Sequence, residues 1–82
     1  MEFTGAIIKE QGVTFSIIQV KPGALTQDNL LKAQSSAPNN FPRPVILAEQ
    51  TSNGYQYLGR QDIVNFLSSV YPEQIPWSNY TV

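Results

Sequence analysis

The sequence predicts an α+β fold in which two ββα units form one two-layer ββαββα domain. Residues 7–12 (Ile-Ile-Lys-Glu-Gln-Gly) resemble residues 46–50 (Ile-Leu-Ala-Glu-Gln), and residues 26–31 resemble residues 60–64 around a shared Gln-Asp pair. Each copy reads as strand, turn, strand and helix. We therefore expect a pseudo-repeat that builds a four-stranded, mostly antiparallel sheet with both helices on one face.

The first unit, residues 1–36, begins with a predicted hairpin. Residues 3–10 and 13–20 are rich in β-branched and aromatic residues, and Gly12 supplies the positive φ that a tight turn requires. A two-residue loop pairs Ile8 with Phe15 and Ala6 with Ile17. We expect these four side chains to face the core.

The first helix is predicted to follow Thr26, whose hydroxyl can accept a hydrogen bond from a free amide of the first turn. Asp28 places a negative charge near the positive end of the helix dipole. Leu30, Leu31 and Ala33 supply the predicted buried stripe. The helix is expected to end near Ser36.

The second unit, residues 45–71, follows a proline-rich loop over residues 37–44. Residues 45–50 and 55–58 are the predicted strands, joined across Asn53-Gly54, a strong hairpin signal. The second helix is the most regular element, because its apolar residues recur at helical spacing until Pro72. Those residues are Ile63, Phe66, Leu67 and Val70.

The repeat alignment also predicts how the sheet faces are used. It matches Ala6 and Ile8 with Val45 and Leu47, so we expect these on the helix-covered face, where the second helix packs on Ile8, Phe15, Ile17 and Leu47. The opposite face would then carry much uncovered apolar surface, formed by Ile7, Ile18, Ile46, Ala48, Tyr55 and Tyr57.

Three things could cover that face: the apolar tail of residues 72–82, a second copy of the chain, or another partner. We expect Trp77 of the tail to be substantially buried there or against a second subunit. The candidate interaction surface is therefore composed of Ile46, Ala48, Tyr55, Tyr57 and Trp77.

Composition limits the possible functions. The 82 residues indicate a single small domain. Because the chain contains neither cysteine nor histidine, it has no disulfide framework, no thiolate zinc site and no histidine base. The formal net charge of −1 provides no long-range field for nucleic acid or an anionic membrane. With no signal peptide or apolar span apparent, the expected location is the cytoplasm.

These observations predict a non-enzymatic protein-interaction or regulatory module that forms a homo-oligomer, a homodimer in the simplest case, with no cofactor, metal or membrane. One alternative is a single-stranded nucleic-acid-binding domain that stacks bases on Tyr55 and Tyr57. Its phosphate contacts would come from Lys9, Lys21, Arg43 and Arg60.

Another alternative is a carboxylate-based hydrolase that uses Glu10 and Glu49, which occupy matching hairpin positions. Both residues flank turns, where carboxylates are normally solvated, so this alternative ranks last.

Overall fold

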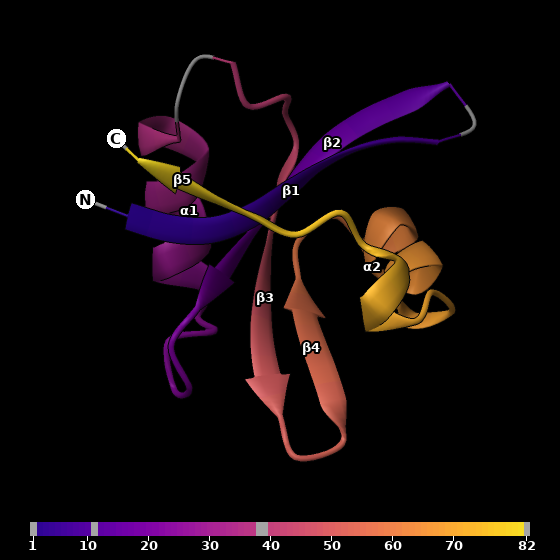
Figure 1. The fold of residues 1–82 in the computed structure, drawn as a ribbon. Coiled ribbons are helices and arrows are strands. Elements are labelled where there is room, and N and C mark those ends of the chain that lie inside the picture. The colour runs from indigo at the N-terminus through magenta and orange to yellow at the C-terminus, as the bar shows by residue number, and fades with distance from the viewer. Residues whose placement is uncertain (1, 11, 38–39, 82) are drawn as a thin grey trace.

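The computed structural model describes residues 2–10, 12–37 and 40–81, and it has an α+β fold with a five-stranded mixed sheet (Figure 1). The sheet order is β4-β3-β2-β1-β5. The elements are β1 (Glu2–Glu10), β2 (Val13–Val20), α1 (Gln27–Ser36), β3 (Val45–Thr51), β4 (Gly54–Leu58), α2 (Gln61–Ser68), a 3₁₀ helix η1 (Pro72–Gln74) and β5 (Ser78–Thr81).

The strand pairing is mixed because the two hairpins are joined in parallel. β1 pairs antiparallel with β2, and β3 pairs antiparallel with β4. β2 and β3 are parallel neighbours, connected through α1. The tail supplies β5, which pairs antiparallel with β1. The prediction of four strands was therefore wrong by one, because the tail, with the strand formers Tyr80 and Thr81, completes the edge of the sheet beside β1.

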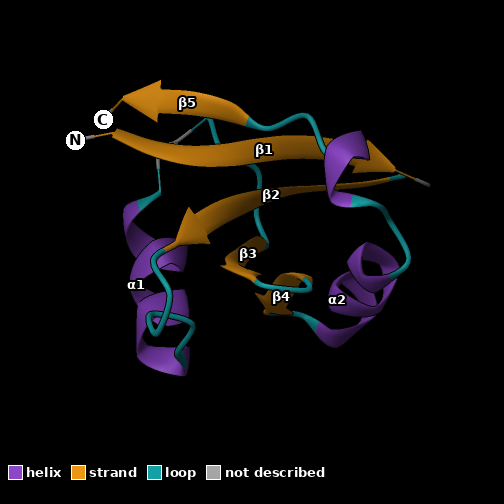
Figure 2. Cartoon of the chain, turned by 60° about the horizontal axis from the view of Figure 1, so that its bottom comes forward, coloured by secondary structure: helices purple, strands orange, loops and turns teal. Residues whose placement is uncertain are grey.

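The two helices lie on opposite sides of the sheet, which corrects the prediction that both cover one face (Figures 1 and 2). α1 belongs to the crossover between parallel strands, and such connections place the helix over one face with a strongly preferred hand. α2 follows the antiparallel strand β4 and packs on the other face. The two ββα units are thus not equivalent in space.

The predicted pairs within the first hairpin, Ile8 with Phe15 and Ala6 with Ile17, are confirmed. The alignment of the second hairpin with the first was wrong by one residue. Ile17 pairs with Ile46, so Ile46 faces the same side as Ala6 and Ile17, whereas Val45 and Leu47 face the other side. A one-residue shift moves every side chain of a strand to the opposite face.

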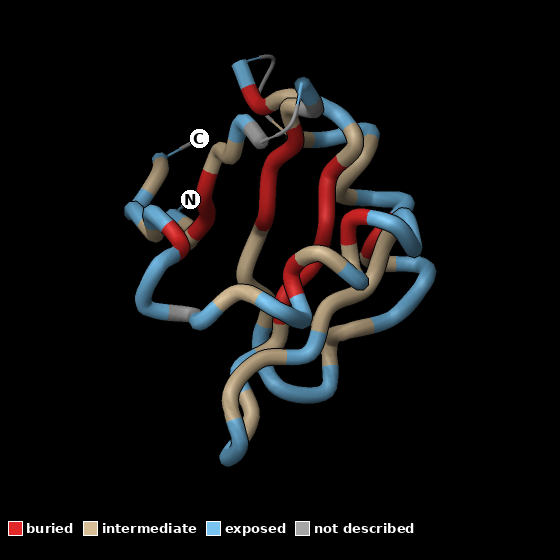
Figure 3. The backbone as a smooth tube through the Cα atoms, turned by 90° about the vertical axis from the view of Figure 1, so that its right-hand side faces the viewer, coloured by how far each residue is buried: buried red, intermediate tan, exposed pale blue. Residues whose placement is uncertain are grey.

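The larger part of the core lies between the sheet and α2. Ile63 and Leu67 are buried against the sheet residues of this face, and Ile75 of the tail joins them. The predicted packing of α2 near Phe15 and Ile17 is confirmed, but Leu47 is buried on the α1 side. Figure 3 shows the buried stretches inside the molecule and the exposed ones at the turns. The sheet residues of this core are Ala6, Phe15, Ile17, Ile46 and Ala48.

On the other face, α1 is fixed by side-chain hydrogen bonds as well as by packing. The Thr26 hydroxyl accepts the N–H of Asn29 at 3.2 Å, which confirms the predicted N-cap. Leu30 is buried, but Leu31 is 59% exposed, so the predicted stripe was too wide. The Gln34 amide bonds both backbone groups of Val45, at 3.0 and 3.1 Å. This contact joins α1 to the start of β3.

Candidate functional site

The structure brings the five residues of the predicted interaction surface together, but not on an open face. Ile46 and Ala48 are fully buried because this is the face that α2 covers. Tyr55, Tyr57 and Trp77 are partly buried at the margin of the same cluster. The error came from the register between β2 and β3, since the repeat alignment had placed the second helix on the opposite face.

Tyr55, Tyr57 and Trp77 form an aromatic stack. The ring centroids of Tyr55 and Trp77 lie 5.2 Å apart, and those of Tyr55 and Tyr57 lie 6.3 Å apart. The tail therefore returns to the sheet, which is one of the two positions predicted for Trp77, and Trp77 is half-buried there. Burial and, secondarily, the neighbouring Tyr55 raise the pKa of Tyr57. The Tyr57 hydroxyl is buried and has no hydrogen-bond partner within the described residues.

The charged residues singled out from the sequence are dispersed, and several serve structural roles. The Glu49 carboxylate accepts the backbone N–H of Gly23 at 2.7 Å, and the Glu10 side chain lies outside the described part of the structure. Arg43 donates to backbone carbonyls that include those of Gln34 and Phe41. Arg60 forms an exposed ion pair with Asp62 at 2.8 Å. Among the side chains that the structure describes, these groups do not converge on a common site.

A different feature, which the sequence analysis missed, is a split between β1 and β2. Over residues 2–10 and 13–20 the ladder joining the two strands ends at the pair Gly5 and Ile18. Beyond that pair β1 continues beside β5, while β2 continues beside β3. The N-terminal part of β1 and the C-terminal part of β2 diverge in Figure 1. The sheet therefore opens at one end.

Gly5 sits at the point of divergence. A Cβ built on Gly5 would lie 2.6 Å from the carbonyl oxygen of Ile17 and 3.5 Å from the ring of Phe41. The two backbones thus approach each other more closely than a side chain would allow. An isolated glycine in a strand is a known signal for such an approach. This was the sequence signal for the split, because Gly5 interrupts an otherwise β-branched and aromatic run.

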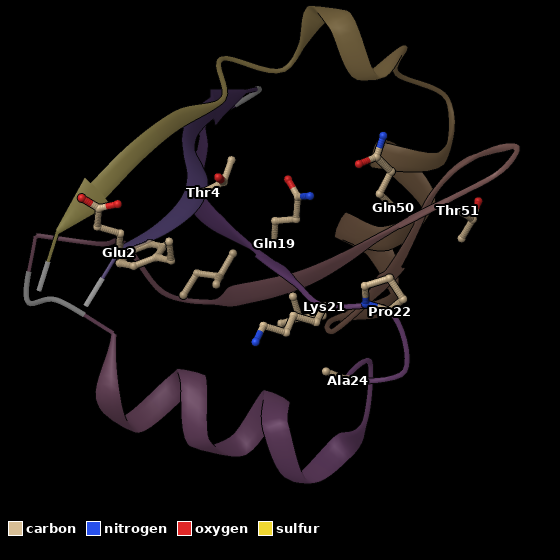
Figure 4. Close-up of a pocket in the computed structure, with 11 residues that line it drawn as sticks. Glu2, Thr4, Gln19, Lys21, Pro22, Ala24, Gln50 and Thr51 are labelled. Carbon is tan, nitrogen blue, oxygen red and sulfur yellow. The ribbon is translucent and has the colours of Figure 1, made fainter.

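The split opens into a cleft of about 790 Å³, which we call the β1–β2 cleft (Figure 4). Its volume falls within the range of typical ligand pockets, roughly 300–1,000 Å³. Its walls are segments of β1 and β2, the end of β3, and the loop between β2 and α1. The lining residues are Glu2, Phe3, Thr4, Ile18, Gln19, Val20, Lys21, Pro22, Ala24, Gln50 and Thr51.

Backbone groups are directed into this cleft from both strands. Ser16 donates its N–H to Pro44 on the β3 side, at 3.3 Å. Because successive residues of a strand direct their backbone groups to alternate edges, the groups of Gln19 and the N–H of Lys21 point toward β1. The Lys21 carbonyl instead accepts the N–H of Ala24 in the following turn, at 2.9 Å. By the same alternation, Glu2 and Thr4 point toward β2. Within the described residues, neither Thr4–Gln19 nor Glu2–Lys21 continues the ladder.

The side chains around the cleft are sorted by the faces of the sheet. Phe3, Ile18 and Val20 lie on the α1 face and are half-buried. The face is identified by Ile18, which pairs with Leu47 in the parallel ladder and therefore points to the same side. Thr4 and Gln19 lie on the opposite face. Figure 4 shows Thr4, Gln19 and Gln50 around the opening, with Lys21 near the loop to α1. The arrangement can hydrogen-bond a backbone while presenting different chemistry on its two sides.

Comparison of the chain with known protein families, curated proteins and solved structures finds no match. Among the described residues, no helix is long and apolar enough to cross a membrane.

Proposed function

We propose that this protein is a non-enzymatic protein-interaction module that binds an extended segment of a partner protein in the β1–β2 cleft. The observation that carries the proposal is the end of the ladder at Gly5 and Ile18, beyond which two strand edges face one open cleft. An added strand gains affinity from main-chain hydrogen bonds and specificity from alternate side chains. This mode of recognition needs no catalytic group.

The two sides of the cleft favour a segment in which apolar and polar residues alternate. Side chains on the α1 side would contact Phe3, Ile18 and Val20. Side chains on the other side would meet Thr4 and Gln19. Since an extended strand directs successive side chains to opposite faces, one alternating segment satisfies both environments.

The charge around the cleft favours a partner segment with little net charge. Glu2 and Lys21 are exposed at its mouth and carry opposite charges, so the lining has no net charge. A neutral site of this kind predicts binding that changes little with salt, in contrast to a site that contacts phosphates.

The nucleic-acid alternative gains less support. The Tyr55 ring is stacked against Trp77 and lies beside Tyr57, which reduces the ring area available to a base. Two of the four basic residues once assigned to phosphates, Arg43 and Arg60, already bond groups of the chain itself. Cytoplasmic location and self-association remain parts of our proposal, and self-association is argued in the next subsection.

The test is selection from a displayed library of random seven-residue segments, followed by backbone NMR of the ¹⁵N-labelled protein with the best synthetic peptide. We expect alternating apolar and polar sequences, with amide shifts concentrated at residues 2–5 and 18–21. A single-stranded oligonucleotide serves as the competing probe. Its binding with shifts at Tyr55 and Tyr57 would favour the nucleic-acid alternative.

A matched pair of variants locates the site. Val20→Lys places a charge in the cleft, whereas Leu31→Lys makes a comparable change on the exposed surface of α1. We expect Val20→Lys to weaken peptide binding at least tenfold and Leu31→Lys to leave it unchanged, with both proteins folded by thermal melting. The absence of any enriched peptide, or equal binding by the two variants, would contradict the proposal.

A further inference from the structure

We propose that two copies of this chain pair through the outer edges of β4, antiparallel and centred on Gln56, to join their sheets into one. This interface goes beyond the peptide-binding proposal, since it uses a strand at the opposite end of the sheet from β1. The sequence had suggested self-association through the face that carries Ile46, Tyr55 and Tyr57, or through the neighbouring edge strand. That face is covered by α2, and the edge of the same hairpin remains open.

The hydrogen-bond pattern identifies the outward groups of this edge. Both backbone groups of Val45 bond the Gln34 side chain, on the edge of β3 that faces away from β2. Alternation then directs the groups of Glu49 toward β4, where Glu49 is paired with Gln56. Gln56 therefore points back to β3. The backbone groups of Tyr55 and Tyr57 point outward.

β4 is the end strand of the sheet, and no described strand pairs with its outer edge. In Figure 1, α2 lies beside the C-terminal end of β4, and the part of β4 nearest the turn from β3 extends away from the other labelled elements. The N–H and C=O groups of Tyr55 and Tyr57 thus form a free strand edge. Such an edge is a template for pairing with another chain.

A second copy fits this edge because the pattern of free groups is self-complementary. In an antiparallel pair centred on Gln56, Tyr55 lies opposite Tyr57 of the second copy. By symmetry, Tyr57 lies opposite Tyr55 of the second copy. Each of these pairs can exchange two backbone hydrogen bonds. Both outward-directed residues of each copy are used, as a two-fold interface requires. The two Gln56 side chains meet at the axis.

The charge distribution also favours a second copy. Residues 54–59, Gly-Tyr-Gln-Tyr-Leu-Gly, contain no charged residue and no proline, so they lack two common devices that prevent strands from pairing at an edge. The nearest charged side chains along the chain, Arg60 and Asp62, are paired with each other. Two identical edges can therefore approach without like-charge repulsion.

The interface is short. A standard specific interface buries roughly 1,200–2,000 Å² in total, and a pair of five-residue strands is expected to fall below that range. We therefore expect a weak dimer that forms reversibly as concentration rises into the micromolar range or above.

Cysteine crosslinking tests the register directly, because the chain has no native cysteine. Gln56 would form a non-hydrogen-bonded antiparallel pair with its copy, and the Cα atoms of such pairs lie about 4.5 Å apart. That separation allows a disulfide. Gln56→Cys should give a covalent dimer under mild oxidation. Gln74→Cys, an exposed residue of η1, is the matched control and should give much less.

Sedimentation equilibrium of the cysteine-free protein completes the test. We expect reversible dimerisation, and we expect Gln56→Lys to raise the dimer dissociation constant at least tenfold, because like charges lie opposite each other at the axis. Gln74→Lys should have no effect. A protein that stays monomeric at millimolar concentration would overturn the proposal. A dimer that forms without preferential crosslinking at residue 56 would overturn it as well, because such a dimer uses another surface.

Discussion

The two ends of the β1–β2 hairpin differ although they belong to the same pair of strands. From Gly5 to Glu10 the strands are paired residue by residue, and Ala6, Phe15 and Ile17 are buried beneath α2. Beyond Gly5 the strands separate, and the side chains between them are only partly buried. The closed end holds the core together, whereas the open end leaves backbone and side-chain groups available to a partner.

The difference arises from what each strand pairs with at the open end. β1 turns to β5, which comes from the tail, and β2 turns to β3, which comes after the α1 crossover. Each strand remains paired on one edge, so the split leaves only one edge of each without a partner. A binding site is obtained in this way without dismantling the sheet.

Leu67→Ala should produce the largest effect at the closed end. Leu67 is 1% exposed within the α2 core, and truncating such a leucine typically costs about 2–5 kcal/mol. Val20→Ala at the open end should cost less than half as much, because Val20 is only partly buried. Chemical denaturation of both variants measures the contrast. Equal losses would mean that the open end is packed as tightly as the closed end.

Gly5→Ala tests the boundary between the two ends. The new Cβ would meet the Ile17 carbonyl at 2.6 Å, so one backbone must shift. We expect a loss of roughly 1–3 kcal/mol, as for other overpacking substitutions. Gly12→Ala is not an equivalent control, because Gly12 has a positive φ. Ala6→Gly, in the same strand, distinguishes the clash from simple strand propensity. A Gly5→Ala protein of unchanged stability would show that the strands do not approach closely there.

Thr26→Ala should have an intermediate effect on the α1 side. It removes the N-cap acceptor for Asn29, and the loss of such a cap costs about 1 kcal/mol. Thr26→Ser keeps the hydroxyl and should retain most of the stability. If both variants melt alike, the cap contributes little to holding α1.

Tyr57→Phe should have the smallest effect and an unusual sign. The buried hydroxyl lacks a partner among the described residues, so removing it should leave stability unchanged or raise it by up to about 1 kcal/mol.

The folded-state pKa of Tyr57 lies above the ordinary 10.0, so the folded protein holds this proton more tightly than the unfolded chain. Stability should therefore fall as pH rises above about 10, and Tyr57→Phe should reduce this fall. Thermal melts across that range test it. A clear loss of stability at neutral pH would indicate that the hydroxyl has a partner.

The sequence was sufficient to predict the local elements because their signals are local. The first hairpin, the Thr26 cap and the apolar face of α2 each depend on a few neighbouring residues. The relation between the two hairpins is not local. It depends on the register of Ile17 with Ile46 across a crossover, and a repeat in sequence does not determine that register. The error in that register exchanged the residues predicted for the two faces of the second hairpin.

The candidate cleft was harder to predict for the same reason. Only Gly5 signalled it, and the meaning of that glycine depends on Ile17 and on a tail strand more than seventy residues away along the chain. Tyr55, Tyr57 and Trp77 do lie near one another, which was one of the two arrangements predicted for Trp77. Their place beside a covered face depended on where α2 packs, which the sequence pattern alone did not determine.

Amide hydrogen exchange of the free protein tests the split most directly. The amides of Ala6 and Ile8 point toward β2 within the closed ladder, and those of Thr4 and Lys21 point into the cleft. We predict strong protection for the first two and exchange at least a hundredfold faster for the second two, with slowing of Thr4 and Lys21 when a cleft-binding peptide is added. Equal protection of all four amides in the free protein would mean that the ladder continues past Gly5, and the proposed site would not exist.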